Sequence, residues 1–307
     1  MPPQGSLRVG LDHGHGFIHA LALRSGDGAL FSALAPIGPG DPARASALAI
    51  QRLLEQAGAR PGDISTLIHS ASAAADAFAE KEQLPLGLIV TAGFPLLPAW
   101  DGREPREEGG LPFLLAPPGR AAEVAGRMDA AGKEAAPLDE EAVRAAAGQF
   151  REGGVEAAAV CLLHSPANPA HERRVREIFR EIHPACRLVL SCETPGRGHE
   201  QARARAALLD AACGLLIRRA LGEAAVRAAE SPRPDTAILI LRSDGSAVPA
   251  RKGLGQPLSA ALSGPAGGLF AAASLARAAR IRRAVALDVG NASAKISLIE
   301  DGVLPLA

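Results

Sequence analysis

The sequence has no tyrosine, one tryptophan and two methionines, and aromatic residues make up 3% of its 307 positions. So few aromatic rings leave little material for the stacking surfaces that single-stranded nucleic acids need. Net charge is absent too, because 33 Lys and Arg balance 33 Asp and Glu. A protein that neutralises nucleic acid phosphates carries a basic excess, so this balance argues against a dedicated nucleic-acid binder.

Cysteines are few and scattered, at Cys161, Cys186, Cys192 and Cys213. No two of them have the spacing of a zinc or redox pair, so we expect reduced, mostly buried thiols. The first twelve residues contain no apolar stretch behind a basic start, so we expect no signal peptide. The longest apolar stretch, 258–276, is interrupted by Ser, Gly and Pro. We therefore expect no membrane span and a cytoplasmic protein.

Short apolar runs alternate with longer amphipathic ones, which predicts an α/β fold. The composition turns rich in Pro, Gly and Glu at 98–119, which indicates a loop or a seam between subdomains. Asp139 is expected to cap a helix. The predicted strands are 7–12, 16–23, 29–33, 66–69, 86–91, 157–163, 187–190, 237–241, 285–288 and 295–299, and the predicted helices are 43–57, 139–151, 169–180, 201–230 and 265–280.

An apolar strand that ends in Asp-x-Gly occurs twice, at Asp12–Gly14 and at Asp288–Gly290. Each is followed by a strand that runs back. A carboxylate beside a glycine turn can bind a cation while backbone N–H groups bind phosphate oxygens. Two such hairpins suggest two related lobes that face each other over a nucleotide. Turns use the same residues to cap themselves, and this alternative stays open.

Together these segments resemble the hydantoinase A/oxoprolinase family of the actin-like ATPase superfamily. The resemblance extends from about Arg8 to the C-terminus and is most specific at 154–178. It implies an α/β fold in which residues 7–190 form an actin-like, ribonuclease H-like N-terminal domain with a mixed sheet. Residues 191–307 would then be the start of a hydantoinase A-type domain, which forms an incomplete second lobe. Further matches lie at 88–94, 127–132, 137–139, 263–268 and 300–302.

Members of this family hydrolyse or activate cyclic amides such as 5-oxoproline and N-methylhydantoin with ATP and Mg²⁺, and relatives are subunits of ketone carboxylases. Phosphorylation of the amide oxygen creates a leaving group, and the protein contributes positioning and charge neutralisation. The resemblance implies Asp12 and Asp288 as catalytic, metal-binding carboxylates and His69 as a catalytic residue. It also implies that a set of glycines binds the nucleotide: Gly14, Gly16, Gly264, Gly267, Gly268 and Gly290.

Two of these assignments have structural alternatives. The glycines of 264–268 precede a predicted helix, where free N–H groups form an anion site. Close packing of that helix against the sheet explains the same glycines equally well. His69 fits a strand-end histidine satisfied by the backbone as well as it fits a catalytic residue.

The departures from the family pattern concern its phosphate loops. In the first loop, 12–19, both threonines and the last carboxylate are missing. In the second loop, 288–295, one glycine is missing and Lys295 takes the place of the last acid. Alanines replace most hydroxyls of a third loop, 69–76. Alanine cannot bind phosphate or metal-bound water, so we expect an impaired or inactive enzyme as an isolated chain. The alternative is a non-catalytic structural or regulatory subunit of a hydantoinase- or ketone-carboxylase-type complex.

Family members continue for hundreds of residues beyond the position matched by Ile299. The last predicted hairpin has an unpaired edge, which needs a covering partner. We therefore expect a homo-oligomer or a second hydantoinase-type subunit, and neither nucleic acid nor membrane as a partner. A fold closed in reduced form and a truncated sequence are the other interpretations.

Two smaller groups of polar residues have competing interpretations. His13, His15 and His19 would share one face of a continuous strand, which allows a transition-metal site. The glycines between them favour solvated loop histidines instead. Glu200 and Arg203 match a family pair, but they also fit a surface ion pair three residues apart.

Overall fold

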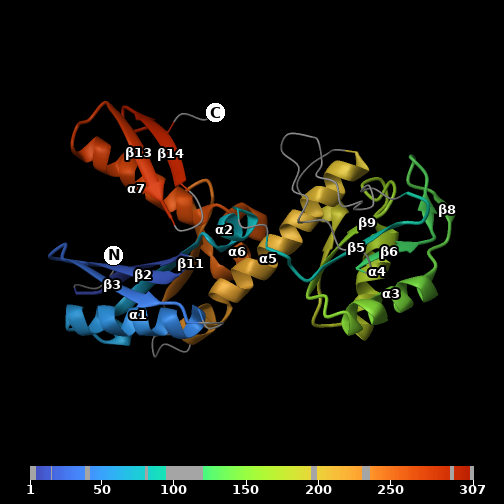
Figure 1. Ribbon diagram of the computed structural model, residues 1–307, viewed down its shortest axis with the longest axis horizontal. Coiled ribbons are helices and arrows are strands. Elements are labelled where there is room, and N and C mark those ends of the chain that lie inside the picture. Colours follow the sequence, from blue (N-terminus) through green and yellow to red (C-terminus); the bar gives the residue numbers. More distant parts are fainter. Residues whose placement is uncertain are drawn as a thin grey trace. The chain divides into compact units, whose positions relative to one another are not determined.

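A computed structural model describes residues 5–14, 16–38, 42–79, 82–94, 120–194, 199–229, 236–290 and 294–304 (Figure 1). The chain divides into two compact units. Unit 1 comprises 1–80 and 216–307, and unit 2 comprises 81–215. The predicted seam at 98–119 lies outside the described residues. The two units do not divide at residue 190, where the sequence analysis placed the domain boundary, because N-terminal and C-terminal segments share one sheet of unit 1.

Unit 1 contains a mixed sheet of six strands in the order β12-β11-β4-β1-β2-β3. The first three strands form an antiparallel meander, while β4 and β11 run parallel to β1. The mixed sheet confirms the predicted architecture. The strands are β1 (Leu7–His13), β2 (Phe17–Arg24), β3 (Leu30–Pro36), β4 (Ile64–Ala71), β11 (Ala237–Leu241) and β12 (Ala247–Pro249).

The core of this sheet lies under α1 (Pro42–Ala57). Alternate residues of β1 are buried, as expected for a strand with one face in the core. Helical spacing places Ala45, Ala49 and Leu53 of α1 against them. The short helices η1 (Pro61–Asp63) and α2 (Ala73–Ala79) flank β4.

The C-terminal part of unit 1 is a hairpin of β13 (Arg283–Val289) and β14 (Ala294–Glu300) beside the helix α7 (Ser263–Ala278). Ala273 and Ala276 of α7 pack against Ile299 of β14. The helix also joins the N-terminal sheet through β4, as described below. It is preceded by α6 (Ala250–Gly255) and η4 (Pro257–Ala260).

Unit 2 is built around a parallel sheet in the order β10-β9-β5-β6. Its strands are β5 (Leu86–Thr91), β6 (Ala121–Val124), β9 (Ala157–Cys161) and β10 (Arg187–Leu190). Strands β5 and β9 are buried throughout, which fits a parallel sheet covered on both faces. The other elements are a two-stranded sheet of β7 (Arg127–Met128) and β8 (Glu134–Ala136), the helices α3 (Glu140–Glu152) and α4 (Ala170–Ile182), η3 (Ser191–Glu193), and the first part of α5 (Glu200–Ala229).

Several predictions from sequence are confirmed by these elements. Asp139 caps α3 by accepting a hydrogen bond from Ala142 N at 3.0 Å. All four cysteines are free, and only Cys192 is not fully buried. Within the described part of the chain, the helices are too short or too polar to cross a membrane.

Candidate functional site

The first Asp-x-Gly turn joins β1 to β2. Asp12 is exposed at the end of β1, and Ser70 Oγ on the neighbouring β4 donates a hydrogen bond to its Oδ1 at 2.7 Å. The backbone N–H of Gly14 donates to Phe17 O at 3.1 Å, which closes the turn. A Cβ at Gly14 would lie 3.2 Å from the same oxygen, so the turn favours glycine. The result is a solvent-facing carboxylate with one oriented oxygen.

The second Asp-x-Gly turn differs from the first because a lysine lies beside its aspartate. Asp288 on β13 lies directly opposite Lys295 on β14, and its Oδ2 is 4.0 Å from Lys295 Nζ. The side chain of Asp288 is 50% exposed and that of Lys295 is 28% exposed. Cross-strand neighbours of opposite charge attract each other. This carboxylate therefore has a cation of the protein beside it.

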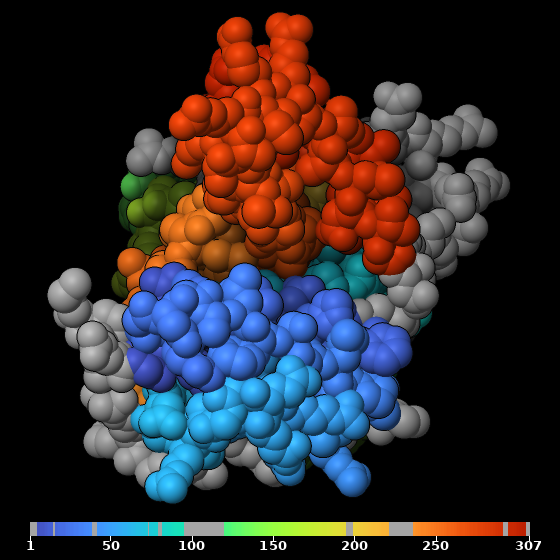
Figure 2. Space-filling view, turned by 90° about the vertical axis from the view of Figure 1, so that its left-hand side faces the viewer, coloured from blue at the N-terminus to red at the C-terminus, as the bar shows by residue number. Residues whose placement is uncertain are grey.

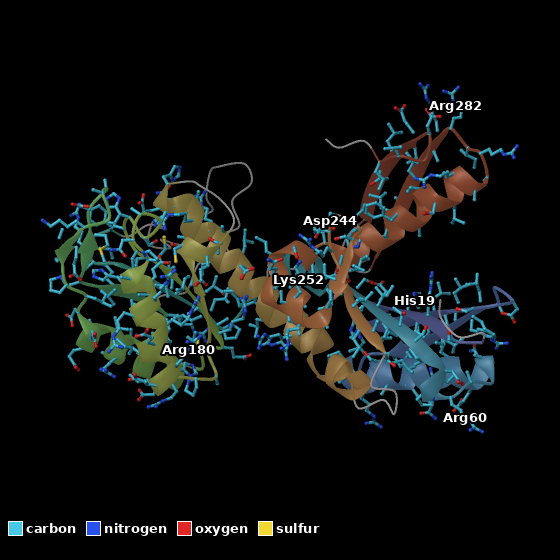
Figure 3. The ribbon with its side chains drawn as sticks, turned by 180° about the vertical axis from the view of Figure 1, so that it is seen from behind. His19, Arg60, Arg180, Asp244, Lys252 and Arg282 are labelled. Carbon is cyan, nitrogen blue, oxygen red and sulfur yellow. The ribbon has the colours of Figure 1, made fainter. Side chains whose placement is uncertain are left out.

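A cavity of about 990 Å³ lies beside this second turn, within unit 1. Residues of α7, the β13–β14 hairpin and the turn between β11 and β12 line it, among them Gly268, Asp288, Lys295 and Asp244. Figure 3 labels Asp244 at that turn. The structure thus brings two of the predicted site residues, Gly268 and Asp288, to one cavity. The other predicted site residues, which do not line it, are Asp12, Gly14, Gly16, His69, Gly264, Gly267 and Gly290.

The start of α7 packs directly on the end of β4. Ser263 Oγ accepts a hydrogen bond from Ala71 N at 3.0 Å and lies 3.2 Å from Ala71 O, to which it donates. A Cβ at Gly264 would lie 3.0 Å from Ser72 N, and one at Gly267 would lie 3.2 Å from a Leu241 methyl group. Close packing therefore explains Gly264. By contrast, a Cβ at Gly268 would meet open space.

Two buried histidines lie beneath the first turn. His13 Nε2 is 3.3 Å from His69 Nδ1, and their side chains are 2% and 0% exposed. Burial lowers the pKa of His13 to about 3, with His69 as a second cause, and burial lowers the pKa of His69 to about 4. Both imidazoles are therefore neutral at pH 7. The interpretation of His13 as a solvated loop histidine is wrong, because β1 continues through it and turns its ring inward.

The outer nitrogens of this pair, His13 Nδ1 and His69 Nε2, are buried without a hydrogen-bond partner among the described residues. His69 is thus sealed from solvent, and its ring meets another histidine where the sequence suggested a backbone partner. His19 lies on the opposite, exposed face of the sheet, directly across from Asp12 (Figure 3). The structure therefore does not gather His13 and His19 around one metal ion, while His15 lies outside the described residues.

Ser72 of the third loop makes two polar contacts of its own. Ser72 Oγ lies within hydrogen-bond distance of Asp76 Oδ2 and 3.1 Å from His13 O. Asp76, in the first turn of α2, is 6% exposed. A carboxylate near a helix N-terminus is stabilised by the helix dipole. Through Ser72, these contacts join α2 to β1, the strand that carries Asp12. The alanine-rich sequence around Ser72 has no hydrophobic periodicity from which the contacts could be predicted.

Unit 2 holds a separate buried polar network at the ends of its parallel strands. Arg203 is 3% exposed, and its Nη1 donates to Ser165 and Ser191 at 2.6 Å each. Glu172 is 0% exposed and accepts hydrogen bonds from Ser191 Oγ at 2.7 Å and Leu162 N at 2.9 Å. The interpretation of Glu200 and Arg203 as a surface pair is wrong for Arg203, because this network encloses its guanidinium.

A divalent cation fits the two turns unequally. In the part of the chain that the structure describes, no three His, Cys, Asp or Glu side chains form a metal-binding group. Mg²⁺ commonly needs only one or two carboxylates together with phosphate oxygens and water. The exposed carboxylate of Asp12 meets that requirement. Asp288 does not, because the ammonium of Lys295 lies beside it.

Comparison with known proteins identifies one family along most of the chain. Residues 8–183 match the Hydantoinase/oxoprolinase N-terminal region, and residues 203–306 match Hydantoinase/oxoprolinase. Caprolactamase subunit alpha from Pseudomonas jessenii is 26% identical over 310 residues, which cover 96% of this chain and 44% of that protein. The 5-oxoprolinase of Saccharomyces cerevisiae is 32% identical over 167 residues, 54% of this chain and 13% of the relative.

A solved structure supports the same fold. The nucleotide-free structure of acetone carboxylase, an enzyme of ATP-dependent acetone carboxylation, aligns with a TM-score of 0.76 at 22% identity. The alignment covers 97% of this chain and 44% of that one. The chain thus spans less than half the length of the relatives it matches.

Proposed function

Because the chain belongs to the hydantoinase/oxoprolinase family, we propose that it forms the nucleotide-binding part of an ATP-dependent enzyme of cyclic amides. We propose further that the isolated chain binds the nucleotide but does not complete hydrolysis. Its relatives support the substrate class, since caprolactam and 5-oxoproline are both cyclic amides.

The residues of the first turn fit one part of the proposed function, the binding of a metal ion. Bound ATP would supply the phosphoryl group that activates an amide oxygen. Asp12 would hold Mg²⁺, and Ser70 fixes the orientation of its carboxylate through the 2.7 Å hydrogen bond. His69 lies too deep to touch a substrate, so its role is to support the strand that presents Asp12. The glycine turn at Gly14 keeps the carboxylate exposed.

The observation that carries the loss of activity is the pairing of Asp288 with Lys295 at 4.0 Å. Phosphoryl transfer depends on charge neutralisation and alignment around the phosphoryl group. A second carboxylate that already holds an ammonium is not free to bind the metal. The first turn also contains no threonine hydroxyl, so one side of the phosphate lacks its donors.

Titration with ATP and an assay of ADP release test this proposal. We expect the purified chain to bind ATP in a calorimeter and to release no additional ADP when 5-oxoproline, caprolactam or hydantoin is added. Amide-dependent ADP release by the isolated chain would contradict the loss of activity, and absence of ATP binding would refute the nucleotide site.

The hairpin favours a second candidate function, that of a structural or regulatory subunit. Within the described residues, β13 and β14 form a sheet of two strands, and one face carries five apolar side chains that are 51–73% exposed. Figure 2 shows this part of unit 1, coloured red, at the molecular surface. Soluble proteins rarely expose large contiguous apolar patches unless these are interaction sites. The five residues are Val285, Leu287, Val289, Ile296 and Leu298.

We propose that a second copy of the chain, in a homo-oligomer, covers this face. One relative is itself named as a subunit, which agrees with a role inside an assembly. Light scattering after gel filtration should show an oligomer, and Ile296→Glu, at a 73% exposed position that does not line the cavity, should reduce its mass. Leu275→Glu, at a 71% exposed position on α7, is the matched control. A monomeric wild-type protein would contradict self-association through this face.

A further inference from the structure

The second Asp-x-Gly turn contains a positive charge where a nucleotide site would place a metal ion. Lys295 and Asp288 are cross-strand partners, and both line the cavity beside α7. A divalent cation bound by Asp288 would lie within a few ångströms of Lys295 Nζ. Like charges at such distances repel each other strongly, even at the effective dielectric of a protein surface.

The other charged side chains that line the cavity, Asp244 and Arg277, make hydrogen bonds of their own. Asp244 Oδ1 accepts hydrogen bonds from Ser246 N at 2.9 Å and Ser246 Oγ at 2.6 Å. Arg277 Nη2 donates to Gly302 O at 2.8 Å. Lys295 therefore supplies the positive charge next to Asp288. Its flexible stem carries three donors, which makes lysine a recurrent phosphate ligand.

We propose that Lys295 replaces the divalent cation at this turn, so that the cavity binds the phosphate groups of an adenine nucleotide without Mg²⁺. This inference rests on the nucleotide binding proposed above and specifies its chemistry. Asp288 then orients the ammonium and does not bind metal. Gly268 at the start of α7 leaves open space on the same cavity, where a Cβ would meet no atom within 4 Å.

Calorimetric titration of the full chain with ATP, once with excess Mg²⁺ and once with EDTA, tests this inference. We expect the two dissociation constants to agree within about threefold. Lys295→Gln should weaken binding in EDTA about tenfold, the loss expected for one charge-assisted hydrogen bond. Lys295→Asp places a second carboxylate opposite Asp288 and should make binding depend on Mg²⁺ by tenfold or more.

Lys252→Asp is the matched control, because Lys252 is exposed on α6 and does not line the cavity (Figure 3). It changes the net charge equally and should leave both dissociation constants unchanged. ATP binding by the wild-type chain that requires Mg²⁺ would overturn the role of Lys295 but leave the nucleotide site intact. Absence of ATP binding under both conditions would overturn the proposed function itself, and this inference with it.

Discussion

The buried pair of His13 and His69 should make unit 1 sensitive to acid. In the folded protein their pKa values are about 3 and about 4, whereas in the unfolded chain both titrate near 6.5. The unfolded chain therefore binds more protons than the folded one between about pH 3 and pH 6.5. Stability is complete above that pH and falls as the pH drops from 6.5 toward 4.

The size of the effect follows from these pKa values. Near pH 5, each imidazole is almost fully protonated in the unfolded chain and neutral in the fold. The difference of about 1.5 pH units below 6.5 corresponds to about 2 kcal/mol for each histidine, and so to about 4 kcal/mol for both. Because a domain is stabilised by about 5–15 kcal/mol in total, this loss is large.

Urea denaturation followed by far-ultraviolet circular dichroism measures the effect at pH 8 and pH 5. The control is the double variant His13→Leu with His69→Leu, which keeps the other histidines and replaces both buried partners with apolar groups. We expect the wild type to lose about 4 kcal/mol more than the variant between the two pH values. Equal losses in the two proteins would refute the assignment of a neutral, buried pair.

Three further predictions concern packing and thiol reactivity. A Cβ at Gly245 would overlap the phenyl ring of Phe270 on α7. Gly245→Ala should therefore cost about 1–3 kcal/mol more than Gly28→Ala, which shares the positive φ but has open space around it. An equal loss of stability in thermal unfolding would count against this contact. Ser263→Ala removes two buried hydrogen bonds and should lower the stability by about 1–3 kcal/mol. Ser274→Ala, on the exposed face of the same helix, should lower it by less than about 1 kcal/mol. Similar melting temperatures of the two variants would contradict the role of Ser263. Burial raises the pKa of the partly exposed Cys192 to about 12. A thiol reagent at pH 7 should therefore react slowly with Cys192 in the native protein and fast after unfolding. A fast reaction of the native protein would contradict the raised pKa.

Hydrophobic periodicity predicted most of the secondary structure. The meander, α1 and β4 follow from local alternation of apolar residues, so their predicted limits lie within a few residues of those observed. The elements that were missed are short or rich in alanine. The sequence 73–79 of α2 has little amphipathic contrast, and β12 contains three residues. Local patterns carry too little information for such elements.

The polar contacts of the site could not be predicted because they join distant residues. His13 and His69 are 56 positions apart, and Ser263 meets Ala71 across 192 positions. The same is true of Arg203, which the sequence places near a helix start but whose guanidinium donates to Ser165, after the end of β9, and to Ser191 of η3. The charge reversal at Lys295 was visible in the sequence. Its cross-strand pairing with Asp288 follows from the hairpin register.

A crystal structure of the protein with bound ADP would test the central claim most directly. We expect the phosphates to lie in the cavity beside α7, in contact with the pair formed by Asp288 and Lys295. ADP bound at a different place, or phosphates that do not contact this pair, would contradict the assignment.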